Sequence, residues 1–572
     1  MRKTWASYLK LEAGQDLVAS LVITILLIPQ SLAYAQLAGL PPETGIFASI
    51  LPLVAYALLG RSSVLAVGPV AIVSLMTAAA LESAGIEGAA AQVAAAGVLA
   101  GMVGGMLIIA GFLRLGFLAN YLSQPVVHGF IISSSIVILI SQLRHVFGVA
   151  IASRDPLLQI GALVQSIPSI NLGALILGVA TLAMLFGLPP LLKAAIPSRF
   201  RDGLAGVLLP RVAPLIAILV TSLAAMWFGG NVALTGEVAV GLPQMPSAEG
   251  AVGMVQSLWL SGLLIALIAF TESHAVAKSF AAKKREAIGA NRELVAIGAA
   301  NIASAVSGGF PVAGGFARTA VSYAAGAATR AAGALTAGLI AISLVLLTDL
   351  YAYIPKATLA VIIIFSISKM INFGEFKPLW SYSRLDAVAY GLTAFGVILL
   401  GVELGLLFGV ILSIAVFFGR ASHPHIAEVG RIPGSEHFRN RNRHRVEASE
   451  TLLLIRIDES LYFANAQYLE SQIMKRAIER REVKDVVLIA SAVNEIDWSG
   501  LEMLLRINDE LKALDVNFHL AEVKGPVMDR LEHSNFLDEL TGKVFLSTSI
   551  AEKTLGPNGR GAAPEMAEGA GI

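Results

Sequence analysis

The chain has 572 residues, of which 56% are hydrophobic and only 14% are charged, and its mean hydropathy is +0.74. Soluble globular proteins carry roughly 25% charged residues, so this composition argues against a soluble protein. The net charge of +1 shows no footprint of nucleic-acid binding, and the lack of cysteine excludes disulfides, thiolate metal sites and cysteine nucleophiles.

Apolar stretches of about 20 residues recur along most of the chain and predict a polytopic helical membrane protein. The composition changes near Gly419, which predicts four parts. These parts are a transmembrane domain at 1–419, a basic, irregular linker at 420–445, a soluble α/β domain at 446–552 and a disordered tail at 553–572. We place fourteen membrane segments at 17–38, 44–60, 69–80, 89–113, 124–141, 172–188, 206–228, 253–281, 291–306, 316–326, 331–348, 354–371, 385–400 and 403–419.

Lysines and arginines collect in every second loop between these segments, for example at Arg61, Arg114 and 283–285. The intervening loops hold few of them. Cytoplasmic loops carry the excess of basic residues in membrane proteins. We therefore expect a multi-pass protein of the cell membrane, embedded in the lipid bilayer, with both termini in the cytoplasm.

The segments at 69–80 and 316–326 are too short to span a bilayer as helices, and each follows a stretch rich in glycine and proline. Each is the third segment of its half of the membrane domain. This placement predicts two inverted repeats with discontinuous helices whose N-termini meet near the midplane. Free N–H groups and the positive dipole end of such a helix favour an anion. The alternative is a pair of short buried helices without a ligand.

Glu272 lies well inside the apolar segment 253–281. A carboxylate in such a position is energetically costly and indicates function, so Glu272 is a candidate to take up and release protons. The alternative is a structural carboxylate paired with a nearby cation.

Arg318 lies at the start of the second short segment. Its guanidinium would add a permanent positive charge to the dipole end, and the planar fork of this group matches an oxyanion. Arg318 could also neutralise Glu272, and the two roles are compatible because the pair could open when substrate enters.

Gln30 and Tyr34 are one helical turn apart after Pro29 and could line a pocket, although such a pair taken alone more often reflects ordinary packing. Glycines 97, 101, 105 and 111 are expected to permit close packing of helices and are given no ligand role.

The motifs Pro29–Tyr34, Gly68–Met76 and Phe316–Val321, together with the C-terminal block, resemble those of the sulfate permease (SulP) family of bacterial, plant and animal anion transporters. The resemblance covers nearly the whole chain. It implies fourteen segments in two inverted seven-segment repeats, which form core and gate subdomains, with elevator-like movement of the core. It also implies a homodimer.

By the same resemblance, a central anion site lies between the third and tenth segments. It would be lined by Gln30, Tyr34, Val70, Ala317, Arg318 and Thr319. Glu272 matches the acidic position of the eighth segment, which this family links to proton or sodium coupling. Sodium-coupled members tend to have a small or hydroxyl residue where Arg318 stands, and a fixed cation there would repel Na⁺. The resemblance therefore favours H⁺ as the coupling ion.

The C-terminal block resembles a STAS domain, similar to anti-sigma-factor antagonists. Its sequence Asp497–Gly500 matches the loop in which the antagonists carry a phosphorylated serine, here Ser499. The alternative is that Ser499 caps the following helix. A cytoplasmic partner of this domain is a further expectation.

The expected function is secondary active transport of an anion of the sulfate, bicarbonate or dicarboxylate class across the plasma membrane, coupled to protons. The alternatives are an anion exchanger or channel without ion coupling, a nucleobase permease of the same fold, or a membrane-tethered sensor that moves nothing. An enzyme is not expected, since no constellation of nucleophile and base or metal cluster is visible, and no cofactor is expected.

Overall fold

The computed structural model of the protein describes residues 12–117, 123–151, 156–197, 206, 209–228, 231–236 and 248–556. The chain divides into two compact units, Met1–Ser413 and Ile414–Ile572, which are described separately here. Within the described residues, eight helices are long and apolar enough to cross a membrane by their length and composition.

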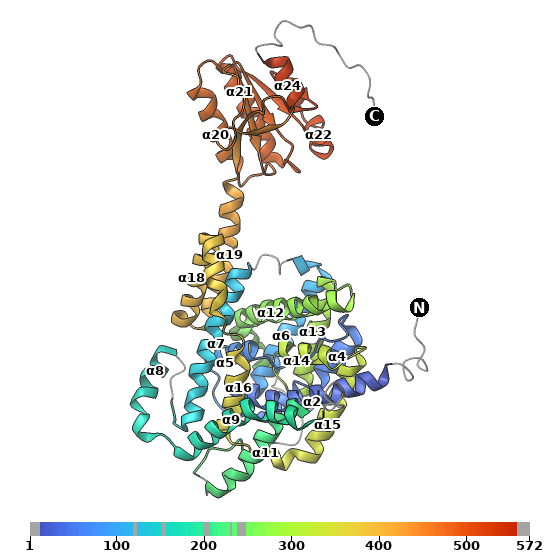
Figure 1. Ribbon diagram of the computed structural model, residues 1–572, viewed down its shortest axis with the longest axis vertical. Helices are drawn as coiled ribbons and strands as arrows, with labels where there is room; N and C mark the ends of the chain where they lie inside the picture. Colours follow the sequence, from blue (N-terminus) through green and yellow to red (C-terminus); the bar gives the residue numbers. More distant parts are fainter. Residues whose placement is uncertain are drawn as a thin grey trace. The chain divides into compact units, whose positions relative to one another are not determined.

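The first unit is built from helices (Figure 1). In its first half these are α2 (Ala13–Leu37), α3 (Pro42–Phe47), α4 (Leu51–Leu59), α5 (Ala71–Ser83), α6 (Ala89–Phe112), α7 (Gln124–Phe147), α8 (Pro156–Gln165), α9 (Leu172–Ala195) and α11 (Ala213–Ala225). In the second half they are α12 (Ala248–Lys284), α13 (Ala290–Ser307), α14 (Phe316–Ala324), α15 (Ala331–Ala352), α16 (Lys356–Ser368), α17 (Phe376–Tyr382), α18 (Arg384–Leu400) and α19 (Val402–Ser422), which continues into the second unit.

Each of the segments predicted from the sequence contains helix, and two of them are interrupted. The second segment breaks between α3 and α4, where Pro52 lies in the first turn of the new helix. In the described stretch 209–228 of the seventh segment, α11 is flanked by short 3₁₀ turns. The sequence did not predict α8 or α17, which are too short to produce an apolar stretch of membrane length.

Two short strands join the halves of the first unit. Strand β1 (Val67–Gly68) pairs with β2 (Ala313–Gly314) in antiparallel register, with Val67 opposite Gly314. Helix α5 follows β1 and α14 follows β2 almost at once. Because antiparallel strands run in opposite directions, the two short helices leave the pair in opposite directions and their N-termini come together at it. This is the arrangement that the inverted-repeat hypothesis predicts.

Helices α6 and α13 approach each other very closely, side by side (Figure 1). A Cβ atom on Gly104 would lie 2.7 Å from the carbonyl oxygen of Gly298, and one on Gly298 would lie 2.8 Å from that of Gly104. Gly111 makes a similar approach to Val295, whereas a Cβ on Gly105 would meet nothing within 4 Å. Of the four glycines expected to permit close packing, Gly111 therefore does so, and the contact also uses Gly104 in place of Gly105.

The second unit contains a six-stranded sheet in the order β4-β3-β5-β6-β7-β8. Strands β5, β6, β7 and β8 run parallel to one another, whereas β3 is antiparallel to both β4 and β5. The elements are β3 (Ile426–Arg431), β4 (Phe438–Asn440), β5 (Leu452–Ile457), α20 (Ala466–Glu479), β6 (Asp485–Ile489), α21 (Trp498–Ala513), β7 (Asn517–Ala521), α22 (Gly525–Glu532), α23 (Phe536–Glu539), β8 (Val544–Phe545) and α24 (Thr548–Leu555).

The boundaries predicted around this unit need correction. The region 420–445 is not an irregular linker, because α19 runs to Ser422 and the strands β3 and β4 join the sheet. Charged side chains on these strands hid the strand pattern, since β4 is an edge strand and exposes Arg439. At the other end, α24 continues to Leu555, within the predicted tail. The rest of that tail, 557–572, lies outside the described residues.

Candidate functional site

The N-termini of α5 and α14 are built alike and neither is capped by a side chain. Their N-cap residues are Val70 and Gly315, which have no side chain able to accept a hydrogen bond. One turn later, the hydroxyl groups of Ser74 and Thr319 each donate back to the cap carbonyl at 2.8 Å. The first-turn N–H groups of both helices are thus left without side-chain caps, and such helix ends attract anions.

The positively charged side chain of Arg318 lies where the N-termini of α5 and α14 come together. Its side chain is only 2% exposed, and its Nη1 donates to the carbonyl oxygen of Pro69, between β1 and α5, at 2.5 Å. The guanidinium therefore bridges from one half-helix to the entry of the other. Its Nε and Nη2 atoms have no hydrogen-bond partner in the described part of the chain. Buried N–H groups of a cation are normally satisfied, so these two atoms mark a place where an oxyanion could bind.

Glu272 lies on α12 beside the same strand pair. The next residue, Ser273, accepts a hydrogen bond from the backbone N–H of Gly314 in β2 at 2.7 Å. Glu272 and Arg318 interact electrostatically, but no ion pair joins them among the described residues, and Oε2 of Glu272 has no hydrogen-bond partner there. Both groups thus keep unsatisfied atoms, as expected if a ligand or a proton is shared between them.

Two further polar residues, which the sequence did not indicate as site residues, hold the chain just before β2 in place. Asn301 on α13 accepts from the N–H of Val312 at 2.9 Å and donates to the carbonyl of the same residue at 3.0 Å. The hydroxyl of Ser304 donates to the carbonyl of Phe310 at 2.6 Å. Both side chains are fully buried in an apolar helix. That position was the available signal, because buried polar groups within a membrane segment usually have a role.

Helix α14 packs against both α2 and α12, which carry the other predicted site residues (Figure 1). Gln30 and Tyr34 of α2 are buried, and Tyr34 interacts electrostatically with both Arg318 and Glu272. Ser366 of α16 lies close to the Tyr34 side chain. Of the predicted anion-binding residues, Ala317 differs from the rest because it is exposed.

Thr319 has a structural role in the site as well. Its hydroxyl oxygen accepts a hydrogen bond from the N–H of Ala66 at 3.3 Å, while the N–H of Gly315 donates to the carbonyl of Ala66 at 3.2 Å. These bonds connect the start of α14 to the chain just before β1. They fix the two half-helix ends relative to each other.

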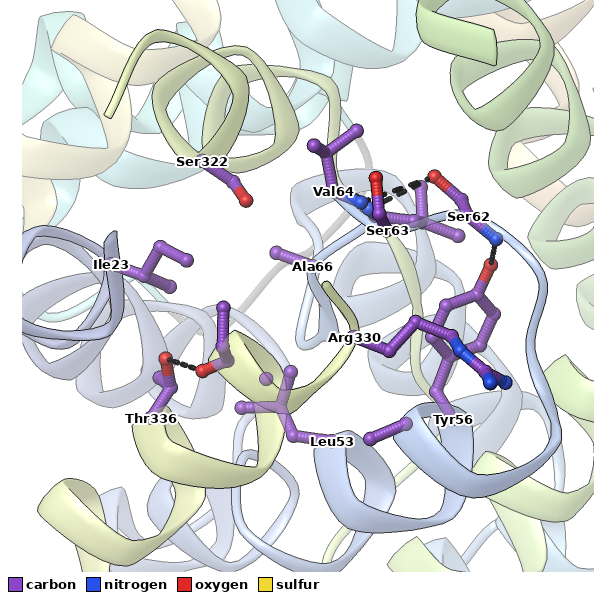
Figure 2. Close-up of a pocket in the computed structure, with 14 residues that line it drawn as sticks. Ile23, Leu53, Tyr56, Ser62, Ser63, Val64, Ala66, Ser322, Arg330 and Thr336 are labelled. Atoms are coloured by element: carbon purple, nitrogen blue, oxygen red, sulfur yellow. Dashed lines mark hydrogen bonds between the residues drawn. The ribbon is translucent and has the colours of Figure 1, made fainter. Parts of the chain in front are cut away.

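A small cavity is lined in part by Ala66, which also bonds to the start of α14. It has a volume of about 10 Å³, enough for one water molecule, and none of the predicted anion-binding residues lines it. Figure 2 shows Tyr56 and Arg330 at one side of the cavity and Ser322 at another. The Tyr56 hydroxyl accepts from the N–H of Ser62 and donates to the buried Glu293 at 2.9 Å. The cavity is therefore a separate feature of the helical unit.

In the second unit, Asp497 caps α21, since its Oδ1 accepts from the N–H of Gly500 at 2.8 Å. The alternative reading of Ser499 as the N-cap is therefore wrong. Ser499 lies in the first turn of α21 and is half-buried, next to Trp498, which is exposed. Its role as a phosphorylation site stays a prediction.

Comparison with protein families identifies both units. Residues 14–393 match the sulfate permease family, and residues 443–551 match the STAS domain. The chain belongs to the sulfate permease family. The resemblance inferred from the half-helix motifs is confirmed, and so is the assignment of the C-terminal domain.

Similar proteins from other organisms support this assignment over nearly the full length. The chain is 32% identical to "Sulfate transporter 4.1, chloroplastic" of Arabidopsis thaliana, over 96% of this chain and 80% of the relative. It is 31% identical to a "Probable sulfate transporter" of Mycobacterium tuberculosis, over 92% of each chain. The chain is therefore a membrane protein of an anion-transporter family.

Solved structures show the same fold. The murine Solute Carrier 26 family member A9 anion transporter in the inward-facing state superposes with a TM-score of 0.84 at 19% identity, covering 96% of this chain and 94% of that chain. The transmembrane domain of a cyanobacterium bicarbonate transporter matches with a TM-score of 0.59 at 20% identity, covering 72% of this chain and 99% of that domain. The first of these likenesses extends over both units of the chain.

Proposed function

We propose that this protein is a secondary active transporter that takes up a small anion of the sulfate, bicarbonate or dicarboxylate class together with protons. The observation that supports this best is the buried guanidinium of Arg318, placed between two uncapped helix N-termini with two nitrogen atoms unpartnered. Permanent positive charge, a planar fork and free N–H groups together suit a compact oxyanion.

Sulfate is the first substrate to test, because several relatives are named sulfate transporters. Its two negative charges would match one guanidinium and two helix dipole ends better than a single charge would. A bicarbonate transporter shares the fold, so bicarbonate remains in the same substrate class.

Movement of the site across the membrane is proposed to follow the elevator scheme. The half-helices α5 and α14, with α2 and α12, would move as a core against a gate that includes α16. Helix α16 packs against α2, with Ser366 close to Tyr34, and this is a contact that such a movement would change. The protein is proposed to work in the plasma membrane as a homodimer, with its STAS domain in the cytoplasm and open to a regulatory partner.

Glu272 is the proposed coupling group. A bound anion would compete for Arg318 and add negative charge near Glu272, which makes it easier for Glu272 to hold a proton. Anion and proton then bind with positive linkage, as symport requires. The fixed cation at Arg318 disfavours Na⁺ at the same place. An exchanger or channel without coupling is the second candidate, and it is favoured only if Glu272 proves dispensable.

The first test replaces Arg318 in proteoliposomes that take up labelled sulfate. Arg318→Gln should weaken apparent sulfate affinity about tenfold or more, because hydrogen bonds to charged groups contribute about 1.5–3 kcal/mol. Gln30→Ala should have a smaller effect, since a neutral amide contributes about 0.5–1.5 kcal/mol. Arg292→Gln, at an exposed arginine at the start of α13, is the matched control.

Transport by a folded Arg318→Gln protein with unchanged sulfate affinity would remove Arg318 from the site. A competing panel of bicarbonate, dicarboxylate, chloride and uracil in the same assay identifies the substrate class. Competition by uracil alone would favour the nucleobase permease over the anion transporter.

A further inference from the structure

Residues 437–445 of the second unit, the basic segment, carry four arginines and two histidines and no acidic residue. The segment begins at strand β4 and continues through the turn that follows it. All four arginines are exposed. This concentration of positive charge has no role in the anion site described above.

Few of these charges are neutralised within the protein. Arg441 forms an ion pair with Glu428 at 2.9 Å. Arg439, Arg443 and Arg445 form no ion pair with any residue that the structure describes. Phe438 holds the start of the segment against the sheet, because its side chain packs on the small apolar cluster around Ala427 on one face of the sheet. The three arginines without an ion pair therefore lie on strand β4 or directly after it, in a part of the chain that is packed against the sheet.

Protection of an exposed sheet edge is the simplest explanation of arginines on β4, since charged side chains prevent pairing of edges between molecules. It does not account for the whole segment. Arg443 and Arg445 lie beyond Asn440, where the strand has ended and no edge needs protection. The opposite edge strand, β8, is flanked by a single lysine, Lys543.

The basic segment closely follows a candidate membrane helix, and this position indicates what the segment could bind. Strand β4 begins sixteen residues after Ser422, the end of a helix that is long and apolar enough to cross a membrane. Clusters of basic residues that closely follow a membrane helix attract anionic phospholipids, and the effect is about fivefold in partitioning per arginine near the surface. We propose that the basic segment binds the anionic headgroups of the leaflet from which α19 emerges. This inference does not depend on the proposed transport activity.

The test uses the full-length protein, whose lack of cysteine allows a single fluorophore at Asn442→Cys. The protein is reconstituted into vesicles of phosphatidylcholine alone or mixed with phosphatidylglycerol, and is labelled only from outside. Energy transfer to an acceptor on lipid headgroups reports the distance of the segment from the bilayer. We expect stronger transfer in vesicles with phosphatidylglycerol, and loss of that gain at high salt.

The triple variant Arg439→Gln, Arg443→Gln, Arg445→Gln should lose most of the gain. The matched control changes three exposed cations elsewhere in the domain, Arg481→Gln, Lys484→Gln and Lys512→Gln, and should keep it. The proposal would be overturned if the unsubstituted segment showed equal energy transfer in both kinds of vesicle. It would also be overturned if the control variant lost as much of the phosphatidylglycerol-dependent transfer as the triple variant. Aggregation of the triple variant with an unchanged lipid effect would assign the arginines to edge protection instead.

Discussion

Gly315 sets how closely the backbone approaches the guanidinium of Arg318. A Cβ atom on Gly315 would lie 2.9 Å from Nη2 and 3.0 Å from Nε, the two nitrogen atoms that lack partners. Any side chain at this position would therefore displace the group proposed to bind the anion. Gly68 lies near Arg318 from the other repeat, but a Cβ there would stay at 3.7 Å, an ordinary contact distance.

This difference leads to a paired prediction. Gly315→Ala should raise the sulfate concentration for half-maximal uptake about tenfold, because it shifts a charged hydrogen-bond donor. Gly68→Ala should leave it within about twofold, since no atom has to move. The measurement is initial uptake into proteoliposomes at varied sulfate. Equal effects of the two substitutions would mean that the guanidinium does not bind the anion.

The sequence could indicate candidate residues for the site but not how they meet. The positions of Arg318 and Glu272 stood out because charges within apolar segments are costly. Asn301 and Ser273 were missed because they act through backbone groups of β2, which no pattern in the sequence places beside them. Contacts between distant segments depend on the three-dimensional packing, and a single sequence does not show them.

At the scale of whole elements, the close contact between α6 and α13 fixes the helices that hold β2. Asn301, which holds Val312, lies on α13 one turn beyond Gly298. A Cβ atom on Gly104 or Gly298 would come within 2.8 Å of the other residue's carbonyl oxygen, so a side chain on either glycine would push the two helices apart. Small residues at such crossings allow the close packing that stabilises membrane helices.

Gly104→Ala should therefore destabilise the helical unit by about 1–3 kcal/mol, the usual effect of overpacking. The neighbouring change Gly105→Ala is the control, because a Cβ there meets nothing within 4 Å. The measurement is the thermal midpoint of the purified protein in detergent. A similar midpoint for both variants would show that the contact does not determine stability.

Elements with a strong pattern were predictable, and those defined by tertiary contacts were not. Strand β5 is apolar at every position except Arg456, a pattern that the sequence shows without knowledge of the neighbouring strands. Strands β3 and β4 were missed because their outward side chains are charged and their pairing depends on β5. The pairing of β1 with β2 involves residues far apart in the sequence, and only the symmetry of the two short segments hinted at it.

At the scale of the whole molecule, each unit has its own hydrophobic core. The main cluster of the first unit contains no residue beyond Val410, and the clusters of the second unit begin at Ile426. The burial of apolar side chains that stabilises each unit therefore takes place within that unit. The second unit is not needed to complete the core around the candidate site.

Truncation after Ser422 should consequently leave a membrane-inserted protein that binds sulfate within about twofold of the full-length affinity. We expect its transport rate or its abundance to change, because a STAS domain is a candidate regulatory unit. Sulfate-dependent thermal stabilisation of the purified truncated protein measures binding without transport. A monodisperse truncated protein that sulfate no longer stabilises would contradict the independence of the two units.

Anion binding at Arg318 and proton binding at Glu272 are proposed to be linked. The most direct test is sulfate accumulation in proteoliposomes under an imposed pH gradient, with wild type, Glu272→Gln and the exposed control Glu87→Gln. We predict that wild type and the control accumulate sulfate faster with an acidic outside, and that Glu272→Gln loses accumulation yet retains sulfate exchange. Accumulation by Glu272→Gln under the same gradient, or wild-type uptake that ignores pH and follows sodium, would contradict the claim.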